Sequence, residues 1–207
     1  FPDLESAQEF LQRCIGASFA ICGIEKKEGT RFPAAPFTTS TLQQEASRKL
    51  RMSVSQTMSI AQRLYEHGLI TYMRTDSTNL SSLALNTAKN FICDNLGPEY
   101  SKVRQYKTKA KGAQEAHEAI RPTYFNQREI EGTPAEKRLY DLIWKRAVAS
   151  QMAAAELNKT TITITSNQSD KVFTATGETT LRMSLTSPPE LTITVPIEMI
   201  FSPPGYF

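Results

Sequence analysis

Apolar and polar residues alternate with a period of two in the C-terminal part of the chain, which is typical of half-buried β-strands, and the N-terminal part has a short apolar run over residues 17–24. Gly177 and the Pro188-Pro189 pair predict turns between the strands of the C-terminal part. Both ends of the chain are therefore expected to be rich in β-structure. The segments that read as strands are residues 17–24, 160–165, 171–176 and 191–200.

The middle of the chain instead has apolar residues at helical spacing. Met58, Ala61, Leu64 and Tyr65 fall on one face of a helix, and Gly68 is placed to end it. Residues 70–75 then read as a short strand, so the order helix, helix, strand resembles that of a winged helix. The expected helices run from Ser40 or Thr41 to about Leu50, from Ser53 or Ser55 to Gly68, from Ser81 or Ser82 to about Gly97, and from Thr133 to about Leu157.

Charge divides the chain at the same places. The 207 residues carry 24 basic and 21 acidic side chains, a formal net charge of +3. Residues 32–157 hold 17 of the basic and 12 of the acidic side chains, whereas residues 1–31 and 158–207 are each weakly acidic. We therefore expect an α+β multidomain fold: a mainly helical, winged-helix-like domain over 32–157, inserted into a β-rich domain formed by 1–31 and 158–207.

Composition excludes several classes of protein. No apolar run approaches the ~18 residues that a membrane-spanning helix needs, so no membrane partner is expected. The three cysteines (Cys14, Cys22, Cys93) lack the spacing of metal ligands and favour a reducing cytosol over a disulfide framework. With two histidines in the chain, no metal site is expected in it, and nothing implies an oligomer.

The densest chemical pattern is Gly68-Leu-Ile-Thr-Tyr-Met-Arg-Thr-Asp-Ser77. On a strand, Tyr72, Arg74 and Asp76 would project to the same side. An activated tyrosine can form a covalent intermediate, and an arginine beside it can hold a phosphodiester through paired hydrogen bonds. The alternative is a half-buried tyrosine followed by an arginine and an aspartate that pair at the surface.

A second pattern, Ala116-His-Glu-Ala-Ile-Arg-Pro-Thr123, adds His117 and Arg121 as candidate phosphate ligands. A lone histidine is more often structural. Residues 100–114 contain no acid and include Lys107, Lys109 and Lys111, a composition suited to a nucleic-acid backbone. Such a run can also be a solvated face.

Three motifs in this order resemble bacterial type IA DNA topoisomerases: Pro36–Ala46, Gly68–Ser77 and His117–Thr123. The resemblance covers residues 1–178. It implies that Tyr72 attacks one DNA strand and forms a 5′-phosphotyrosine, and that Arg74 and His117 sit at the same site. Asp76 and Arg121 match other positions of these motifs and, like the three lysines of the basic run, are expected to contact DNA. The resemblance also implies that a β-rich arch carries the helical domain.

The same resemblance implies strand cleavage, strand passage and religation, which relax negative supercoils without ATP. The family's Mg²⁺ site belongs to a Toprim domain that nothing in residues 1–207 resembles. The chain is therefore expected to be an excised piece that does not cleave DNA alone, from an enzyme of the bacterial cytoplasm and nucleoid that binds single-stranded DNA at the cleavage site. Two other hypotheses remain: a non-enzymatic winged-helix DNA-binding module and a tyrosine recombinase.

Overall fold

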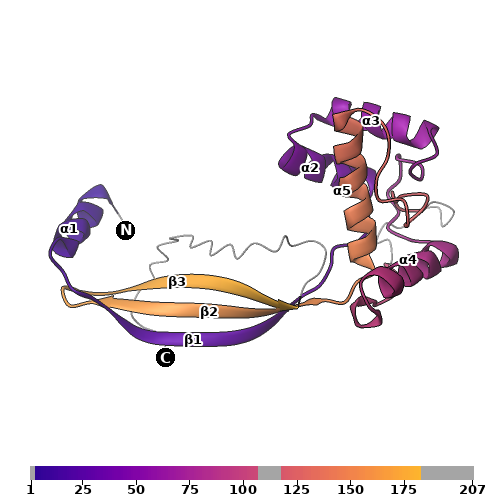
Figure 1. The fold of residues 1–207 in the computed structure, drawn as a ribbon. Coiled ribbons are helices and arrows are strands. Elements are labelled where there is room, and N and C mark those ends of the chain that lie inside the picture. The colour runs from indigo at the N-terminus through magenta and orange to yellow at the C-terminus, as the bar shows by residue number, and fades with distance from the viewer. Residues whose placement is uncertain (1–2, 107–117, 183–207) are drawn as a thin grey trace. The chain divides into compact units, whose positions relative to one another are not determined.

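The computed structural model describes residues 3–106 and 118–182. These residues divide into two compact units, one made of the N-terminal residues to 31 together with 156–182, the other of residues 32–155 (Figure 1). Within the described ranges, no helix is both long and apolar enough to cross a membrane. The predicted strand over 191–200 lies outside these ranges.

The first unit is built on a three-stranded sheet in the order β1-β2-β3, formed by β1 (Phe19–Arg31), β2 (Ala155–Ser166) and β3 (Ser169–Arg182) (Figure 1). β2 and β3 pair antiparallel, with Thr163 opposite Thr174. The strands predicted at 160–165 and 171–176 are confirmed as parts of β2 and β3. The turn predicted at Gly177 is wrong, because Gly177 pairs with Thr160 inside β3.

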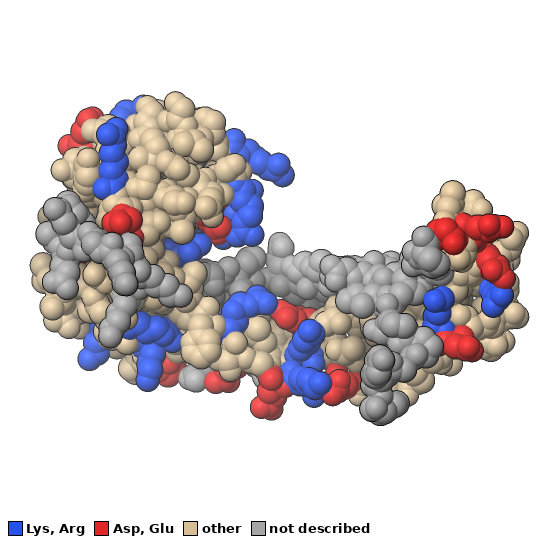
Figure 2. Space-filling model, turned by 180° about the vertical axis from the view of Figure 1, so that it is seen from behind, with Lys and Arg blue, Asp and Glu red and all other residues tan. Residues whose placement is uncertain are grey.

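Both signs of charge are mixed along this sheet (Figure 2). On β1, Lys27 pairs with Glu25 at 2.9 Å, and Arg31 pairs with Glu178 of β3 at 2.6 Å. Charged side chains on an edge strand discourage pairing with another chain. Because residues 25–31 are mostly charged, the apolar run over 17–24 predicts only the first half of β1.

A helix precedes the sheet where the sequence pattern predicts only strand. α1 (Leu4–Cys14) is capped by Asp3, whose carboxylate accepts a hydrogen bond from the backbone N–H of Ser6 at 2.7 Å. Phe10 is its buried residue, and its ring packs against that of Phe173 with a centroid distance of 5.8 Å. The description of residues 1–31 as strand-rich is therefore wrong for its first half.

The helical elements described in the second unit are α2 (Thr39–Leu50), α3 (Val54–Glu66), α4 (Ser82–Asn95), the 3₁₀ turn η1 (Pro98–Tyr100) and α5 (Pro134–Ser150). Among them, α2 and α3 pack against each other and against α5. Thr38, Ser53, Ser81 and Thr133 cap the four α-helices. The helix predicted to continue to Leu157 ends at Ser150, because β2 begins at Ala155. The largest fully buried side chains of the unit include Trp144, Tyr140, Phe37, Leu42, Ile60, Leu64 and Met73.

The predicted strand over residues 70–75 is wrong as a regular strand. In the described part of this unit, extended segments pair only as isolated bridges, which join Phe37 to Ile120, Ile70 to Pro122 and Ser101 to Met152. Gly68 does end α3 as predicted, with a φ of +68°. The α+β composition of the chain is confirmed.

Candidate active site

The segment that carries Tyr72 connects α3 to α4 and alternates in exposure. Tyr72, Arg74 and Asp76 are exposed, whereas Met73, Thr75 and Ser77 between them are buried. The predicted alternation therefore exists without a strand. The buried residues hold the segment on the core, and the three candidate residues face solvent.

Two different partners bind the backbone of this segment, which is why no continuous ladder forms. The hydroxyl of Thr39 donates to the carbonyl of Met73 at 2.8 Å and accepts from the N–H of Thr75 at 2.9 Å. On the other side of Tyr72, the N–H of Thr71 donates to the carbonyl of Arg121 at 2.9 Å. The backbone on each side of Tyr72 is thus fixed, while its side chain is 42% exposed.

The ring of Tyr72 rests against a second exposed tyrosine. Tyr65, in the last turn of α3, meets it edge-to-face with ring centroids 5.3 Å apart. Edge-to-face contacts restrict the rotation of both rings. The phenol of Tyr72 therefore reaches the surface in a limited range of orientations.

A pocket of about 430 Å³ lies between the N-terminus of α2 and residues 74–76 of the tyrosine segment. Its lining combines the start of that helix with the far part of the tyrosine segment, namely Thr38, Thr39, Ser40, Arg74, Thr75 and Asp76. The N-terminus of a helix carries partial positive charge and favours anions. The first turn of α2 has no acidic residue, and Asp76 is the acidic member of the pocket lining, opposite in charge to Arg74. Within the described ranges, neither Arg74 nor Asp76 forms an ion pair.

Arg121 is placed differently from the other candidates. Its side chain is only 12% exposed, and its guanidinium donates to Glu118 at 2.5 Å and to the carbonyl of Pro122 at 3.0 Å. It therefore binds within the protein, and a contact with DNA stays a prediction. His117, Lys107, Lys109 and Lys111 lie outside the described residues.

A family model described as "DNA topoisomerase" matches residues 1–184. The chain belongs to this family. The resemblance to bacterial type IA topoisomerases drawn from the three motifs is confirmed.

Curated topoisomerases and a solved structure agree with this assignment. DNA topoisomerase 1 of Mycobacterium tuberculosis (strain H37Rv) is 52% identical over 176 residues, which cover 79% of this chain and 19% of the relative. DNA topoisomerase 1 of Zymomonas mobilis is 50% identical over 165 residues, 79% of this chain and 14% of the relative. Full-length topoisomerase I of Thermotoga maritima matches with a TM-score of 0.70 and 35% identity, covering 89% of this chain and 31% of that one. The chain thus spans less than a fifth of the length of these curated relatives.

Several residues around the candidate site carry no functional signal in the sequence. Thr38, Thr39 and Ser40 read there only as a helix start, and Thr71 and Glu118 only as neighbours of the candidates. Their roles depend on contacts between segments more than 30 residues apart, which periodicity cannot reveal.

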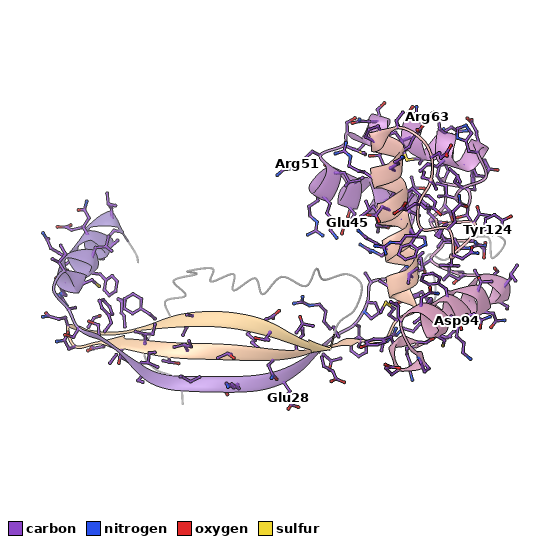
Figure 3. The ribbon with its side chains drawn as sticks, in the orientation of Figure 1. Glu28, Glu45, Arg51, Arg63, Asp94 and Tyr124 are labelled. Carbon is purple, nitrogen blue, oxygen red and sulfur yellow. The ribbon has the colours of Figure 1, made fainter. Side chains whose placement is uncertain are left out.

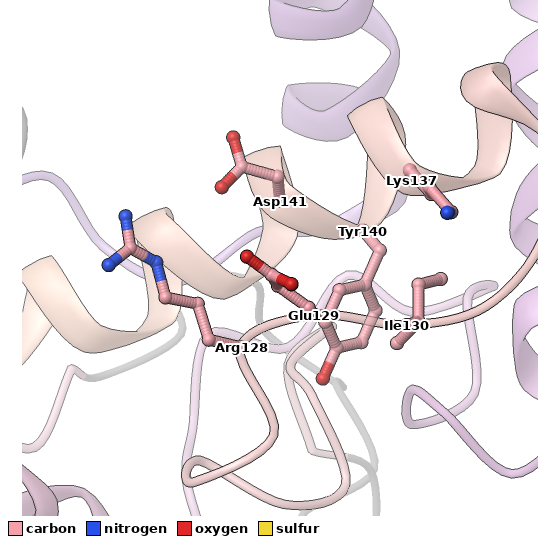
Figure 4. A pocket seen from close by; sticks show the side chains of 6 residues that line it. All are labelled: Arg128, Glu129, Ile130, Lys137, Tyr140 and Asp141. Atoms are coloured by element: carbon pink, nitrogen blue, oxygen red, sulfur yellow. The ribbon is translucent and has the colours of Figure 1, made fainter.

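The topoisomerase chain has a second pocket, of about 300 Å³, beside α5 (Figure 4). Arg128 and Lys137 stand on opposite sides of Tyr140 there, with Glu129 and Asp141 among the other lining residues. Burial raises the pKa of Tyr140 to about 12, and its hydroxyl donates to the carbonyl of Gln127 at 2.6 Å. Tyr140 is therefore a core residue and an unsuitable nucleophile.

Proposed function

We propose that this chain is the part of a bacterial type IA DNA topoisomerase that supplies the nucleophile, Tyr72, for cleavage of one DNA strand. The observation that carries the proposal is that Tyr72 and Arg74 are both exposed, two residues apart on one fixed segment, and that Arg74 lines the pocket at the N-terminus of α2. A phosphodiester is an anion that both the arginine and the helix N-terminus attract. The family assignment supports the same reaction.

In this reaction the phenolic oxygen of Tyr72 attacks the scissile phosphorus. The bond from phosphorus to the 3′-oxygen breaks, the 3′-oxygen takes up a proton, and the phenol loses one. The product is a 5′-phosphotyrosine, and the reverse attack by the 3′-hydroxyl religates the strand. The number of phosphodiester-type bonds does not change, so relaxation of negative supercoils needs no ATP.

The remaining candidates have supporting roles in the proposal. Arg74 binds the non-bridging oxygens of the phosphate, and His117 positions or protonates one of them. Asp76, Lys107, Lys109 and Lys111 contact the single-stranded DNA around the cleavage site.

The enzyme's Mg²⁺ is assigned to another part of the longer protein. Within residues 3–106 and 118–182, no three His, Cys, Asp or Glu side chains cluster to hold a metal ion. The described residues therefore do not fit the Mg²⁺ site of the family. We assign it to a Toprim domain and expect no cleavage from this chain alone.

At the level of domains, we propose that residues 32–157 form a winged-helix-like, DNA-facing insert, and that 1–31 with 158–207 form an arch. The excess of basic side chains in the insert supports this assignment. The enzyme would act in the bacterial cytoplasm, on the nucleoid.

The test is a chimeric enzyme in which this chain replaces the matching segment of the M. tuberculosis relative. It is incubated with Mg²⁺ and single-stranded DNA labelled at the 3′-end, and the covalent adduct is measured. We expect the label to remain on the protein, because the 5′-phosphate side carries the 3′-end. Tyr72→Phe should abolish the adduct, whereas Tyr65→Phe, which changes the neighbouring exposed tyrosine, should preserve it.

An adduct that survives Tyr72→Phe would contradict the proposal. So would label retained only from the 5′-end, which is the outcome expected of a tyrosine recombinase. DNA binding by the chimera without any adduct would favour the non-enzymatic winged-helix module.

A further inference from the structure

Thr71, which directly precedes Tyr72, is joined to a distant segment by an unusually dense set of hydrogen bonds. Its hydroxyl donates to the carbonyl of Ala119 at 2.7 Å and accepts from the N–H of Arg121 at 3.0 Å. Its own N–H donates to the carbonyl of Arg121 at 2.9 Å. The backbone at the attachment point of the proposed nucleophile is therefore tied to residues 119–121.

The segment that Thr71 binds is itself immobilised by an ion pair. Glu118 accepts from the guanidinium of Arg121 at 2.5 Å and from the backbone N–H of Ser81 at 2.6 Å. Burial raises the pKa of Glu118, but the hydrogen bonds from Ser81 and Arg121 outweigh burial and hold this pKa below its usual value. The carboxylate therefore stays ionised at neutral pH. The side chain thus links residues 118–121 to the N-terminus of α4.

The buried neighbours on the same segment strengthen the tie. Ala119 and Ile120 are fully buried, and the N–H of Ile120 donates to the carbonyl of Phe37 at 2.8 Å. Phe37 lies two residues before Thr39, which binds the other side of the tyrosine segment. Hydrogen bonds to Thr39 on one side of Tyr72, and to residues 119–121 on the other, therefore hold the backbone that carries it.

From these hydrogen bonds we propose that Thr71 is a positioning residue for cleavage: its hydroxyl sets the orientation of Tyr72 toward the scissile phosphate. The proposal rests on the function proposed above for Tyr72. Thr71 does not touch DNA in this role. It acts through the backbone it shares with the nucleophile, and small misplacements of a reacting group are costly.

The chain offers a matched control. Thr123 lies on the same two paired segments, and its hydroxyl donates to the carbonyl of Gly68 at 2.7 Å. Thr71→Val and Thr123→Val therefore each remove one hydroxyl that bridges the same segments, at nearly constant shape. Only Thr71 adjoins the nucleophile. Thr71→Ser keeps the hydroxyl and serves as the rescue.

The experiment uses the chimeric enzyme described above and measures the single-turnover cleavage rate constant at saturating DNA, together with the Kd for DNA. We expect Thr71→Val to lower the rate constant about 10- to 100-fold with Kd changed less than about twofold. Thr123→Val and Thr71→Ser should stay within about threefold of the parent. Equal losses in the two valine variants, or a Thr71→Val effect confined to Kd, would overturn the proposal.

A second measurement separates this proposal from the proposed function. If the unmodified chimera forms no adduct, the function of Tyr72 fails and Thr71 has nothing to position. In the 207-residue chain itself, amide hydrogen exchange at residues 71–75 should rise in Thr71→Val and not in Thr123→Val. Exchange that is unchanged in Thr71→Val would overturn the positioning role whatever the chimera does.

Discussion

The ring of Tyr72 packs against that of Tyr65 with an interplanar angle of 68°, although both side chains are about two-fifths exposed. Such a pair contributes ~0.5–1.5 kcal/mol beyond the burial of its area. Tyr65 belongs to the last turn of α3, so the orientation of the Tyr72 ring depends on where that helix ends. The residue that ends it is Gly68, whose φ of +68° favours glycine.

Gly68→Ala tests whether the end of α3 requires glycine in this left-handed conformation. Nothing lies within 4 Å of an added Cβ at Gly68, so only the backbone conformation opposes the change. We expect a loss of about 1–2 kcal/mol in the free energy of unfolding, measured by urea denaturation. Gly177→Ala in β3, where the space is equally open and φ is not positive, should cost no more than about 0.5 kcal/mol. Equal losses in the two variants would show that the left-handed conformation is not the cause.

At the site, exposure was predictable and hydrogen bonding was not. That Tyr72, Arg74 and Asp76 share the exposed side follows from the two-residue alternation of an extended segment. The segment does not form a regular strand, because the hydroxyl of Thr39, and not a neighbouring strand, binds the backbone of Met73 and Thr75. No local pattern distinguishes such a threonine from a helix-capping residue.

At the scale of elements, the contact of α3 with α5 contains an ion pair that also serves as a cap. Glu136, at the third position of α5, accepts from the guanidinium of Arg63 on α3 at 2.7 Å and from the N–H of Thr133 at 2.8 Å (Figure 3 labels Arg63). The hydrogen bond from Arg63, followed by those from Thr133, lowers the pKa of Glu136 to about 2. The capping box was readable from the sequence, whereas its partner on α3 was not.

This pKa sets a pH dependence for stability. A carboxyl whose folded pKa lies below its usual 4.5 stabilises the fold above that value, and the contribution is lost as the pH falls toward 2. Glu136→Gln should therefore be less stable than the parent at pH 6, and the difference should shrink toward pH 2. Urea denaturation across this range measures it. Asp141→Asn, in the exposed pair with Lys145, should show a small difference at every pH. A Glu136→Gln difference that stays constant from pH 6 to 2 would exclude the ion pair as its source.

Helices with a capping residue and an apolar face were predicted well, and elements held by tertiary contacts were not. α1 buries Phe10 against the side chain of Phe173, more than 160 residues away, so its short amphipathic pattern was easily missed. The charged second half of β1 is extended because β2 supplies its hydrogen-bond partners. Likewise, Gly177 continues β3 because Thr160 lies opposite, which overrides its local preference for a turn.

At the scale of the whole molecule, charge separates the two parts more clearly than composition does. Residues 32–157 hold 17 of the 24 basic side chains, whereas those of the sheet are balanced by acids, as in the pairs of Lys27 with Glu25 and Arg31 with Glu178. A net charge of +3 for the chain thus understates the attraction that the helical part offers to a polyanion. The assignment of DNA binding to that part stays a prediction.

Salt dependence of binding tests this assignment directly. For single-stranded DNA, log Kobs falls with log salt with a slope of about −0.7 per phosphate neutralised, because bound counterions are released. Lys109→Ala/Lys111→Ala should therefore weaken binding of the 207-residue chain and make the slope shallower by about 1.4. Lys26→Ala/Lys27→Ala removes the same number of charges from β1 and should leave the slope within about 0.3 of the parent. Fluorescence anisotropy of a labelled oligonucleotide between low and physiological salt gives both slopes. If the two double variants change the slope equally, the DNA does not select the helical part, and the charge asymmetry of the chain has no role in binding.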